Sequence, residues 1–259
     1  MRKLDDMELL EDHSGAWCNA NELTSSFMEA ISFVTPILEI FFIRTVSKAI
    51  TVQTNPDLQQ SCRAFMREEA IHIRAHRRFN ASLLKYLHTI PPGVAMIQSL
   101  LNLAKQYLSL SHSLMLATTL EHFSAVLSKQ YLVQQSQWHF LCLFTKELFA
   151  QHAREELAHR SVVFDLWFSH GKSSPIERTL IVFAVLFSGL VYVAIAIPYI
   201  LYHKKGKRLK ATLSALISFA IKKPANLFIC SSLRELFLFA DSNYHPEYLV
   251  SKRVISGIE

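Results

Sequence analysis

One pattern of glutamate and histidine residues occurs twice in this 259-residue chain. A lone Glu is followed some thirty residues later by a Glu-x-x-His motif, and the same order then repeats. A helix turns about 100° per residue, so positions three or four apart share a face, and each motif presents a carboxylate and an imidazole to one side. The six residues of the pattern are Glu39, Glu69, His72, Glu121, Glu156 and His159.

Four helices that supply such side chains to a shared interior form the two-metal carboxylate site of ferritin-like bundles. Carboxylate oxygens and imidazole nitrogens together suit iron and manganese. We therefore predict that these six residues hold two metal ions, iron in the first place, with manganese and zinc as alternatives.

A solvated helix face is the other explanation for a Glu-x-x-His motif, and for a single copy it is the better one. The two lone glutamates argue against it here, because Glu39 lies in the apolar stretch 34–43 and Glu121 in the apolar stretch 116–123. Buried carboxylates are costly unless they are paired or bind a metal. The repeated pattern therefore favours metal ligation.

Five further residues lie beside the proposed ligands. His76 and His152 continue the two motif faces, as additional ligands or as groups that orient the ligands. We favour the orienting role, because six ligands already suffice. His122 follows Glu121 directly and points about 100° away, so we expect a histidine of the core or of an interface. Glu68 and Glu155 are expected to face outward or to pair with arginine.

The helical pattern predicts an all-α fold, a ferritin-like four-helix bundle with a C-terminal hydrophobic helical extension. A Pro-Pro-Gly sequence at 91–93 is a firm break, and Gly171–Pro175 reads as a helix end followed by a linker. The predicted helices cover roughly 21–50, 56–87, 95–134 and 138–168. The predicted organisation is a flexible N-terminus at 1–20, the four-helix two-metal bundle at 21–170 and a hydrophobic, basic helical region at 176–259.

Composition agrees with a helical protein of a reducing compartment. The chain is 51% hydrophobic with only 6 glycines, which suits long helices better than a turn-rich sheet. Its four cysteines are scattered without a C-x-x-C motif, so they read as buried thiols. The N-terminus lacks the apolar run of a secretory signal, which favours the cytoplasm.

The last third of the chain differs in charge and hydropathy. Residues 1–178 hold 17 basic and 17 acidic side chains, whereas residues 179–259 hold 10 and 4. The stretch 179–202 has no charged residue, and about 20 apolar residues suffice to cross a bilayer. Five basic residues follow within 203–210.

A single membrane pass would keep this basic flank in the cytoplasm and send the first 178 residues outside without a signal. We therefore predict a peripheral or monotopic anchor on anionic lipid, through residues 179–223, at the cytoplasmic side of the inner membrane. A single pass and a core helix that covers the bundle are the alternatives. Nucleic acid is not expected as a partner, and a homodimer stays open.

Four stretches around the ligands resemble the bacterial family described as predicted metal-dependent hydrolases. They are 41–46, 68–80, 120–127 and 155–165. The resemblance covers about residues 20–170 and extends more weakly into the hydrophobic tail. It implies a metal site at Glu39, Glu69/His72/His76, Glu121/His122 and His152/Glu156/His159. The ligand set itself looks more like ferritin-like di-iron oxidases and oxygenases than like zinc hydrolases.

Three functions fit such a site. Two ferrous ions held by carboxylates can reduce O₂, so we favour O₂-dependent oxidation or oxygenation of an unknown, lipid-like substrate, with an electron donor as a further partner. A two-metal hydrolase, in which the paired ions clamp the reacting oxygens, is the alternative. A non-enzymatic iron-binding protein is the third.

Overall fold

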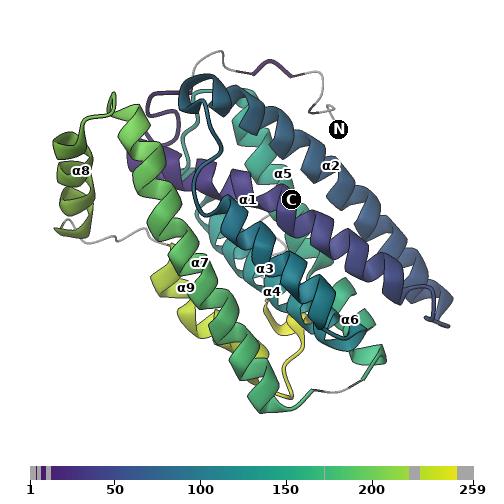
Figure 1. The fold of residues 1–259 in the computed structure, drawn as a ribbon. Helices are drawn as coiled ribbons and strands as arrows, with labels where there is room; N and C mark the ends of the chain where they lie inside the picture. Colours follow the sequence, from purple (N-terminus) through teal and green to yellow (C-terminus); the bar gives the residue numbers. More distant parts are fainter. Residues whose placement is uncertain (1–3, 5–6, 10–12, 172, 222–227, 250–259) are drawn as a thin grey trace.

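The computed structural model describes residues 4, 7–9, 13–171, 173–221 and 228–249. Within these ranges the chain is all-α, as predicted, and its one extended pairing is an isolated antiparallel bridge between Cys18 and Phe140 (Figure 1). The helices are α1 (Glu22–Ala49), α2 (Pro56–Leu87), α3 (Val94–Tyr107), α4 (Leu110–Val133), α5 (Leu143–His159), α6 (Val162–Ser169), α7 (Pro175–Lys204), α8 (Leu209–Ile221) and α9 (Phe228–Leu236). Short 3₁₀ turns are η2 (Gln135–Gln137), η3 (Phe237–Ala240) and η4 (Pro246–Leu249).

The first two helices begin and end where the sequence predicts. Asn21 and Asn55 cap α1 and α2, because each side-chain oxygen accepts hydrogen bonds from two backbone N–H groups of the first turn. Pro56 occupies the first position of α2, where a missing N–H does no harm.

The prediction of a single third helix over 95–134 is wrong, because the chain breaks into α3 and α4. Leu108 is extended, with ψ 143°, and Ser109 caps the new helix by accepting a hydrogen bond from the backbone N–H of His112 at 3.2 Å. The side chain of Ser109 thus supplies a helix start that the apolar pattern hides.

The predicted fourth helix over 138–168 is also wrong in its bounds. Residues before Leu143 are extended and pair with the N-terminal segment, through bonds from Asn19 N to His139 O (2.7 Å) and from Leu141 N to Trp17 O (3.0 Å). A second break separates α5 from α6 after His159. Backbone pairing with a distant segment has no local signature in the sequence.

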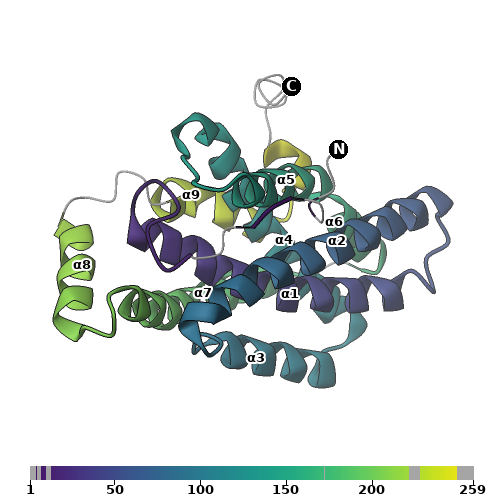
Figure 2. The same ribbon diagram turned by 90° about the horizontal axis from the view of Figure 1, so that it is seen from above.

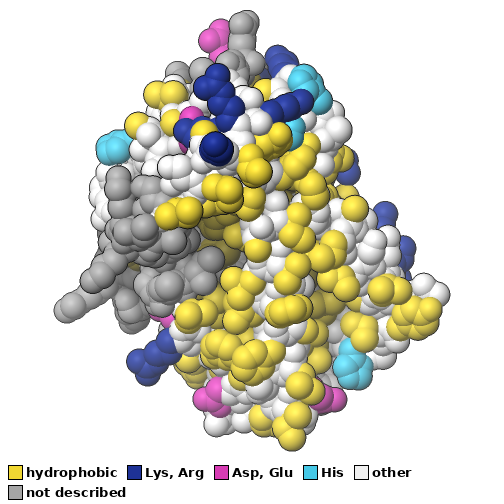
Figure 3. Space-filling view, turned by 60° about the vertical axis from the view of Figure 1, so that its left-hand side comes forward, with side chains coloured by type: hydrophobic (Ala, Val, Ile, Leu, Met, Phe, Trp, Pro, Cys, Tyr) yellow, Lys and Arg dark blue, Asp and Glu magenta, His cyan; other side chains and the backbone are white. Residues whose placement is uncertain are grey.

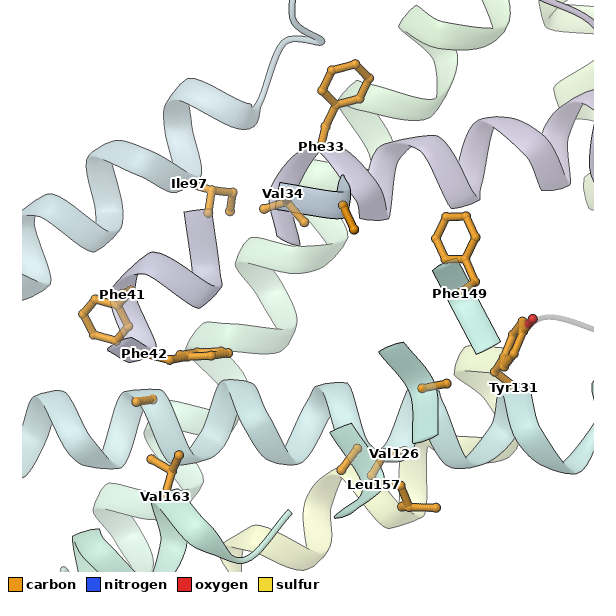
Figure 4. Packing of buried hydrophobic residues seen from close by; sticks show 14 of the residues in the cluster. Phe33, Val34, Phe41, Phe42, Ile97, Val126, Tyr131, Phe149, Leu157 and Val163 are labelled. Carbon is orange, nitrogen blue, oxygen red and sulfur yellow. The ribbon is translucent and has the colours of Figure 1, made fainter. Parts of the chain in front are cut away.

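The four helices that carry the repeated pattern share one interior. Helix α1 packs along α2 and helix α4 along α5, while α1 also contacts α4 and α2 contacts α5. Apolar side chains of these helices belong to one buried cluster, among them Val34 and Phe42 of α1, Val126 of α4 and Phe149 of α5 (Figure 4). The all-α class is therefore confirmed, while the closer likeness to ferritin-like bundles stays a prediction.

Part of the stretch 1–20, which the sequence predicts to be flexible, packs against the helices. Among its described residues, Trp17 is 1% exposed and Cys18 is fully buried. The indole of Trp17 lies edge-on to Phe79 and stacked on Phe149, at 5.4 and 6.1 Å between ring centroids. This part of the segment is therefore packed into the core of the bundle.

Helix α7 lies against the bundle instead of standing apart from it. Figure 2 shows α3 and α7 together below α1, with α5 above it. The hydroxyl of Tyr192 donates a hydrogen bond to the carbonyl of Ala30 at 2.5 Å. Its ring closes on Gly93, whose φ is +94° and whose missing Cβ would come within 3.0 Å of that ring.

The other side of α7 faces outward. The most apolar 18-residue stretch of α7 has a mean hydropathy of 2.8 and is 28% buried, whereas the corresponding stretch of α1 has 1.7 and is 67% buried. Among the described residues these two helices are long and apolar enough to cross a membrane, judged by length and composition alone. The burial identifies α1 as a core helix, whereas most of the outer side of α7 is exposed and its Phe183 ring lies 5.1 Å from that of Phe237 in η3.

A buried ion pair joins the C-terminal end of α7 to α1. The ammonium of Lys204 lies 2.8 Å from Glu29, and both side chains are fully buried. The same ammonium donates to the carbonyls of His13 and Gly15. Glu29 also accepts a hydrogen bond from the indole N–H of Trp17 at 2.5 Å. Burial raises the pKa of Glu29, and Lys204 opposes that rise.

We predict that Lys204→Met destabilises the protein by about 3–5 kcal/mol, because it leaves a buried carboxylate without its cation. Lys205→Met is the control, since Lys205 pairs with Glu22 at a partly exposed position where an ion pair contributes less than about 1 kcal/mol. Chemical denaturation followed by circular dichroism measures both changes. Equal stabilities of the two variants would show that the buried pair does not hold α7 in place.

Candidate metal centre

All six residues of the repeated pattern point into the interior of the chain. Their exposed fractions lie between 0 and 7%. Glu39 comes from α1, Glu121 from α4, and each Glu-x-x-His motif from one turn of α2 or α5. The spacing of three residues places the carboxylate and the imidazole of each motif on the same helical face, as the sequence predicts.

Four side chains meet closely enough to hold a metal ion. They are Glu39, His72, His152 and Glu156, whose candidate ligand atoms all lie within 4.8 Å of one another. The Nδ1 atom of His72 is central, at 3.5 Å from Glu39 Oε1 and 3.8 Å from Glu156 Oε1. His152 Nδ1 lies 3.6 Å from the same oxygen of Glu39.

Glu69 extends this cluster toward the second half of the pattern. Its two carboxylate oxygens face different histidines, with Oε2 at 3.7 Å from His72 Nδ1 and Oε1 at 3.4 Å from His159 Nδ1. Glu121 lies in the same electrostatic environment, since the charges of Glu156 and Glu69 act on its pKa. The six predicted ligands are thus neighbours in space.

The polar atoms of this cluster lack hydrogen-bond partners among the described residues. Both oxygens of Glu39, Glu69, Glu121 and Glu156 are buried and unbonded, which makes eight orphaned carboxylate oxygens. Buried polar groups are normally satisfied, so a convergent set of orphans needs an explanation. The ring nitrogens left over are His72 Nδ1, His76 Nε2, His152 Nδ1 and His159 Nδ1. Oxygen and imidazole donors that converge in this way fit a divalent metal ion.

The pKa values of the cluster reflect the crowding of its charges. Burial raises the pKa of Glu39 and of Glu121 well above their usual range, and neighbouring carboxylates add to the rise. Burial and the charge of Glu69 raise the pKa of Glu156 to about 7. Burial would raise the pKa of Glu69 as well, but the nearby imidazoles of His159 and His72 lower it, at 3.4 and 3.7 Å from its oxygens. Metal binding at this site must therefore expel protons.

Two glutamates beside the ligands hold the ligand histidines from behind. The Nε2–H of His72 donates to Glu155 at 2.5 Å, and the Nε2–H of His159 donates to Glu68. The bonds cross between helices, since Glu155 belongs to α5 and His72 to α2, while the other pair runs in the opposite sense. Each bond leaves the Nδ1 atom of its imidazole facing the cluster.

This arrangement corrects the expectation that Glu68 and Glu155 face outward or pair with arginine. Both reach across to the opposite helix, and Glu155 accepts a further bond from Gln151 at 2.9 Å. A carboxylate behind a ligand histidine fixes the ring orientation and raises its basicity. The signal was present in the sequence as Glu-Glu-x-x-His in both copies, but only the helix pairing shows which partner each outer Glu meets.

His152 is placed as a candidate ligand instead of the favoured orienting role, because its ring belongs to the closest group. His76 stays behind it, with 5.0 Å between their ring centroids. The ring centroids of His72 and His152 are 4.6 Å apart. Three imidazoles therefore gather at one side of the cluster, whereas His159 stands against Phe65 at the other.

A chain of hydrogen bonds sets the tautomer of His76. The Asn80 amide N–H donates to the carbonyl of Ser32, so the Asn80 oxygen faces the Ser32 hydroxyl and accepts its proton at 2.7 Å. The Ser32 oxygen is then free to accept the Nδ1–H of His76 at 2.9 Å. Burial lowers the pKa of His76 to about 3, so its ring is neutral and Nε2 keeps a lone pair.

His122 is a structural histidine of an interface, as predicted from its position. Its Nε2–H donates to the carbonyl of Glu235 at 2.9 Å, and its Nδ1 lies 3.2 Å from the hydroxyl of Tyr244. These partners belong to the C-terminal segment that packs on α4. The family resemblance that grouped His122 with Glu121 therefore does not make it a ligand in this structure.

One groove near the cluster lies over α5 and is also lined by Met7 of the N-terminal segment. Its volume is about 630 Å³, and Glu155 forms part of its wall. Its remaining lining residues are Met7, Leu143, Glu147, Gln151, Arg154 and Ala158. Because Glu155 contacts His72, this groove adjoins one histidine of the proposed ligand set.

Comparison with known proteins identifies the family. A family model described as "predicted metal-dependent hydrolase" matches residues 2–249, so the chain belongs to that family. The resemblance found in the motifs is thus confirmed over a longer part of the chain than the motifs cover. No curated protein and no solved structure matches the chain.

We predict that Glu155→Gln weakens metal affinity about 10-fold to 100-fold, because an amide is a poorer acceptor behind His72 than a carboxylate. Competition with a metal-binding dye measures the affinity. Glu147→Gln is the matched control on the same helix, since Glu147 contacts only the surface residue Arg154 among its described ion-pair partners. Unchanged affinity in Glu155→Gln would reduce the cross-helix bond to a packing contact.

Proposed function

We propose that this member of the predicted metal-dependent hydrolase family is a two-metal hydrolase of an ester or phosphoester. The observation that carries the proposal is the set of eight orphaned carboxylate oxygens and four unpaired ring nitrogens, buried in one interior. Four carboxylates cannot remain charged together in an apolar core without cations. Two divalent ions would neutralise them.

If two ions bind, the carboxylate and imidazole donors would divide between them. Glu39, His72 and His152 lie at one side, while Glu121 and His159 belong to the other half of the repeat. Glu69 faces histidines of both halves with its two oxygens, so it is the best candidate for a shared ligand. Glu156, its counterpart in the repeat, would share in the same way.

When bound, divalent ions polarise an ester or phosphoester and acidify water. The chain's own residues orient and shield. Glu155 and Glu68 hold two imidazoles in fixed orientations, and Glu155 links one of them to the surface groove. The neutral ring of His76 offers Nε2 as an acceptor for one proton close to His152. The apolar walls exclude bulk water.

O₂-dependent oxidation is the second candidate function, and the donor set is the observation that favours it. Four carboxylates are more than a typical zinc hydrolase site uses, and they suit iron. Such chemistry needs an electron donor, which would have to dock from outside this chain.

The decisive experiment separates the two functions by oxygen. Protein purified anaerobically is analysed for bound metals, loaded with zinc, manganese or ferrous iron, and offered nitrophenyl esters and phosphodiesters without O₂. Turnover is expected, and Glu69→Ala or Glu156→Ala should abolish it together with metal binding, because each removes a central carboxylate. Glu147→Ala serves as the control. Absence of turnover with every metal, accompanied by rapid O₂ consumption by the ferrous protein, would favour the oxidase.

We also propose that the protein works at an anionic membrane surface, as a monotopic protein on the cytoplasmic side. The outer stripe of α7 carries Leu180, Phe183, Phe187 and Leu190, which are 46–71% exposed. Helix α8 continues it with Leu209, Leu213 and Ile217 at intervals of four residues. Figure 3 shows apolar side chains spread over this face and lysine and arginine gathered at one end.

The contacts that hold α7 against the other helices favour a helix that lies in the plane of the membrane surface over one that crosses the bilayer. Lys204 and Tyr192 keep its inner side on the bundle, so only the outer side is free for lipid. Exposed basic residues follow at 207, 208 and 210, where they would meet anionic headgroups.

We predict that Leu180→Ser/Phe183→Ser/Phe187→Ser weakens the affinity for phosphatidylglycerol vesicles, measured by sedimentation, by about 100-fold or more, because each apolar side chain would contribute up to about 1.5–3 kcal/mol if lipid buried it fully. High salt should not release the unmodified protein, since apolar burial is not screened. The control exchanges three equally exposed apolar residues elsewhere, Val52, Val133 and Leu141, for serine. Equal losses in both variants would argue against α7 as the membrane face.

A further inference from the structure

A second hollow lies away from the metal donors, between α1 and α3. The two helices pack side by side, with Ile97 of α3 near Val34 of α1 (Figure 4). Beyond this contact they leave a groove that the start of α4 closes. Its lining residues are Ile37, Ile40, Phe41, Arg44, Thr45, Lys48, Gln98, Leu101, Asn102, Lys105, Leu108, Leu110 and Ser113.

The groove is apolar at one end and cationic at the other. Residues 37, 40 and 41 of α1 give an aliphatic and aromatic wall, and Arg44 and Lys48 follow on the same helical face. Across the groove, Leu101 is followed one turn later by Lys105. Polarity therefore changes along its length in the same order on both helices.

The three cations have no acidic counterpart. No aspartate or glutamate belongs to the lining, and α3 contains none at all. Within the described part of the chain, no ion pair involves Arg44, Lys48 or Lys105. Like charges four residues apart on a helix, such as Arg44 and Lys48, destabilise it by a few tenths of a kcal/mol. An anion between the helices would remove that repulsion.

We propose that this groove binds an anionic amphiphile. The phosphate or carboxylate headgroup lies between Arg44, Lys48 and Lys105, where arginine can donate two parallel hydrogen bonds to it. The hollow has a volume of about 110 Å³, so only the first carbons of the hydrocarbon chain lie along Ile37, Ile40 and Leu101, and the rest follows the exposed surface of α3. A zwitterionic headgroup has no net negative charge to pair with the three cations, so we expect it to bind more weakly. An inorganic anion would pair with the cations but would make no contact with the apolar end of the groove.

The groove is a different site from the metal centre. None of its lining residues belongs to the proposed ligand set, although Phe41 lies close to Glu39 in sequence. Binding can therefore be measured without turnover and without metal. Failure of the proposed hydrolase function and failure of this proposal are separate outcomes.

Two sources could supply the same chemistry, a free amphiphile from solution or a headgroup of a bilayer lipid. Helix α3 also packs against α7, and it exposes Leu100, Leu103 and Tyr107 on its own surface. A bilayer that covers the outer side of α7 would reach α3 as well. The experiment therefore needs a monomeric arm and a vesicle arm.

Calorimetric titration of the full chain with short-chain phosphatidic acid, below its micelle-forming concentration, tests the proposal. The unmodified protein should bind it, should bind phosphatidylcholine of the same chain length more weakly, and should not be saturated by inorganic phosphate. Arg44→Gln/Lys48→Gln/Lys105→Gln should lose affinity about tenfold or more, as three partly screened contacts predict. Circular dichroism reports that the variant is folded.

The matched control removes three exposed cations of α2 by Arg63→Gln/Arg67→Gln/Arg74→Gln, with the same change in net charge. Equal losses in the two variants would overturn the proposal, and so would full affinity in the groove variant or tight binding of inorganic phosphate. Loss of binding to phosphatidic acid vesicles together with the monomer assigns the groove to bilayer lipid. Loss of the monomer alone assigns it to a free amphiphile.

Discussion

The enclosure of four carboxylates in an apolar interior is the constraint on which the rest of this structure depends. Like charges at such proximity raise one another's pKa and would drive the helices apart unless protons or cations intervene. Imidazole rings face these carboxylates, and the two outer glutamates, Glu68 and Glu155, accept hydrogen bonds from two of the rings. Because the outer bonds cross between α2 and α5, the register of these helices is tied to the chemistry of the site. A slip of one residue between them would break both bonds and turn the ligands away together.

Helix α7 shows how one element can serve two environments. Its inner side is specified by polar contacts that only a packed helix makes, including the buried ammonium of Lys204 and the hydroxyl of Tyr192. Its outer side carries exposed apolar residues at helical spacing, of which Phe183 contacts Phe237 of η3. Hydropathy alone cannot separate these sides, because both are apolar. The division into a metal-binding bundle and a membrane-associated remainder therefore stays a prediction, and the contacts of α7 with α1 show that the two parts adjoin.

Much of the fold and of the site was accessible from the sequence, for a physical reason. Helical periodicity and asparagine caps act locally, so α1 and α2 were predicted almost to the residue, and the Glu-x-x-His spacing placed each ligand pair on one face. The misses depended on contacts between distant segments. The break before Ser109 rests on a single side-chain cap, and the extended stretch before Leu143 pairs with the N-terminus. The inward face of His152 follows from its spacing, but the partner of Glu155 and the closeness of His152 to Glu39 follow only from how the helices meet.

The uneven distribution of imidazoles has a consequence for how the centre would be assembled. Phe65 stands four residues before Glu69, where the second copy of the pattern has His152 before Glu156, so the two halves of the repeat differ in nitrogen content. Nitrogen-rich positions discriminate more strongly in favour of the later transition metals. With two ions bound, the half-site of His72 and His152 would fill first and exchange last, while the half-site of His159 would follow the metal supply of the cell. Such a centre could bind two different metals at once. The metals found in it would then depend on the order in which they bound, and not only on their concentrations in the cell.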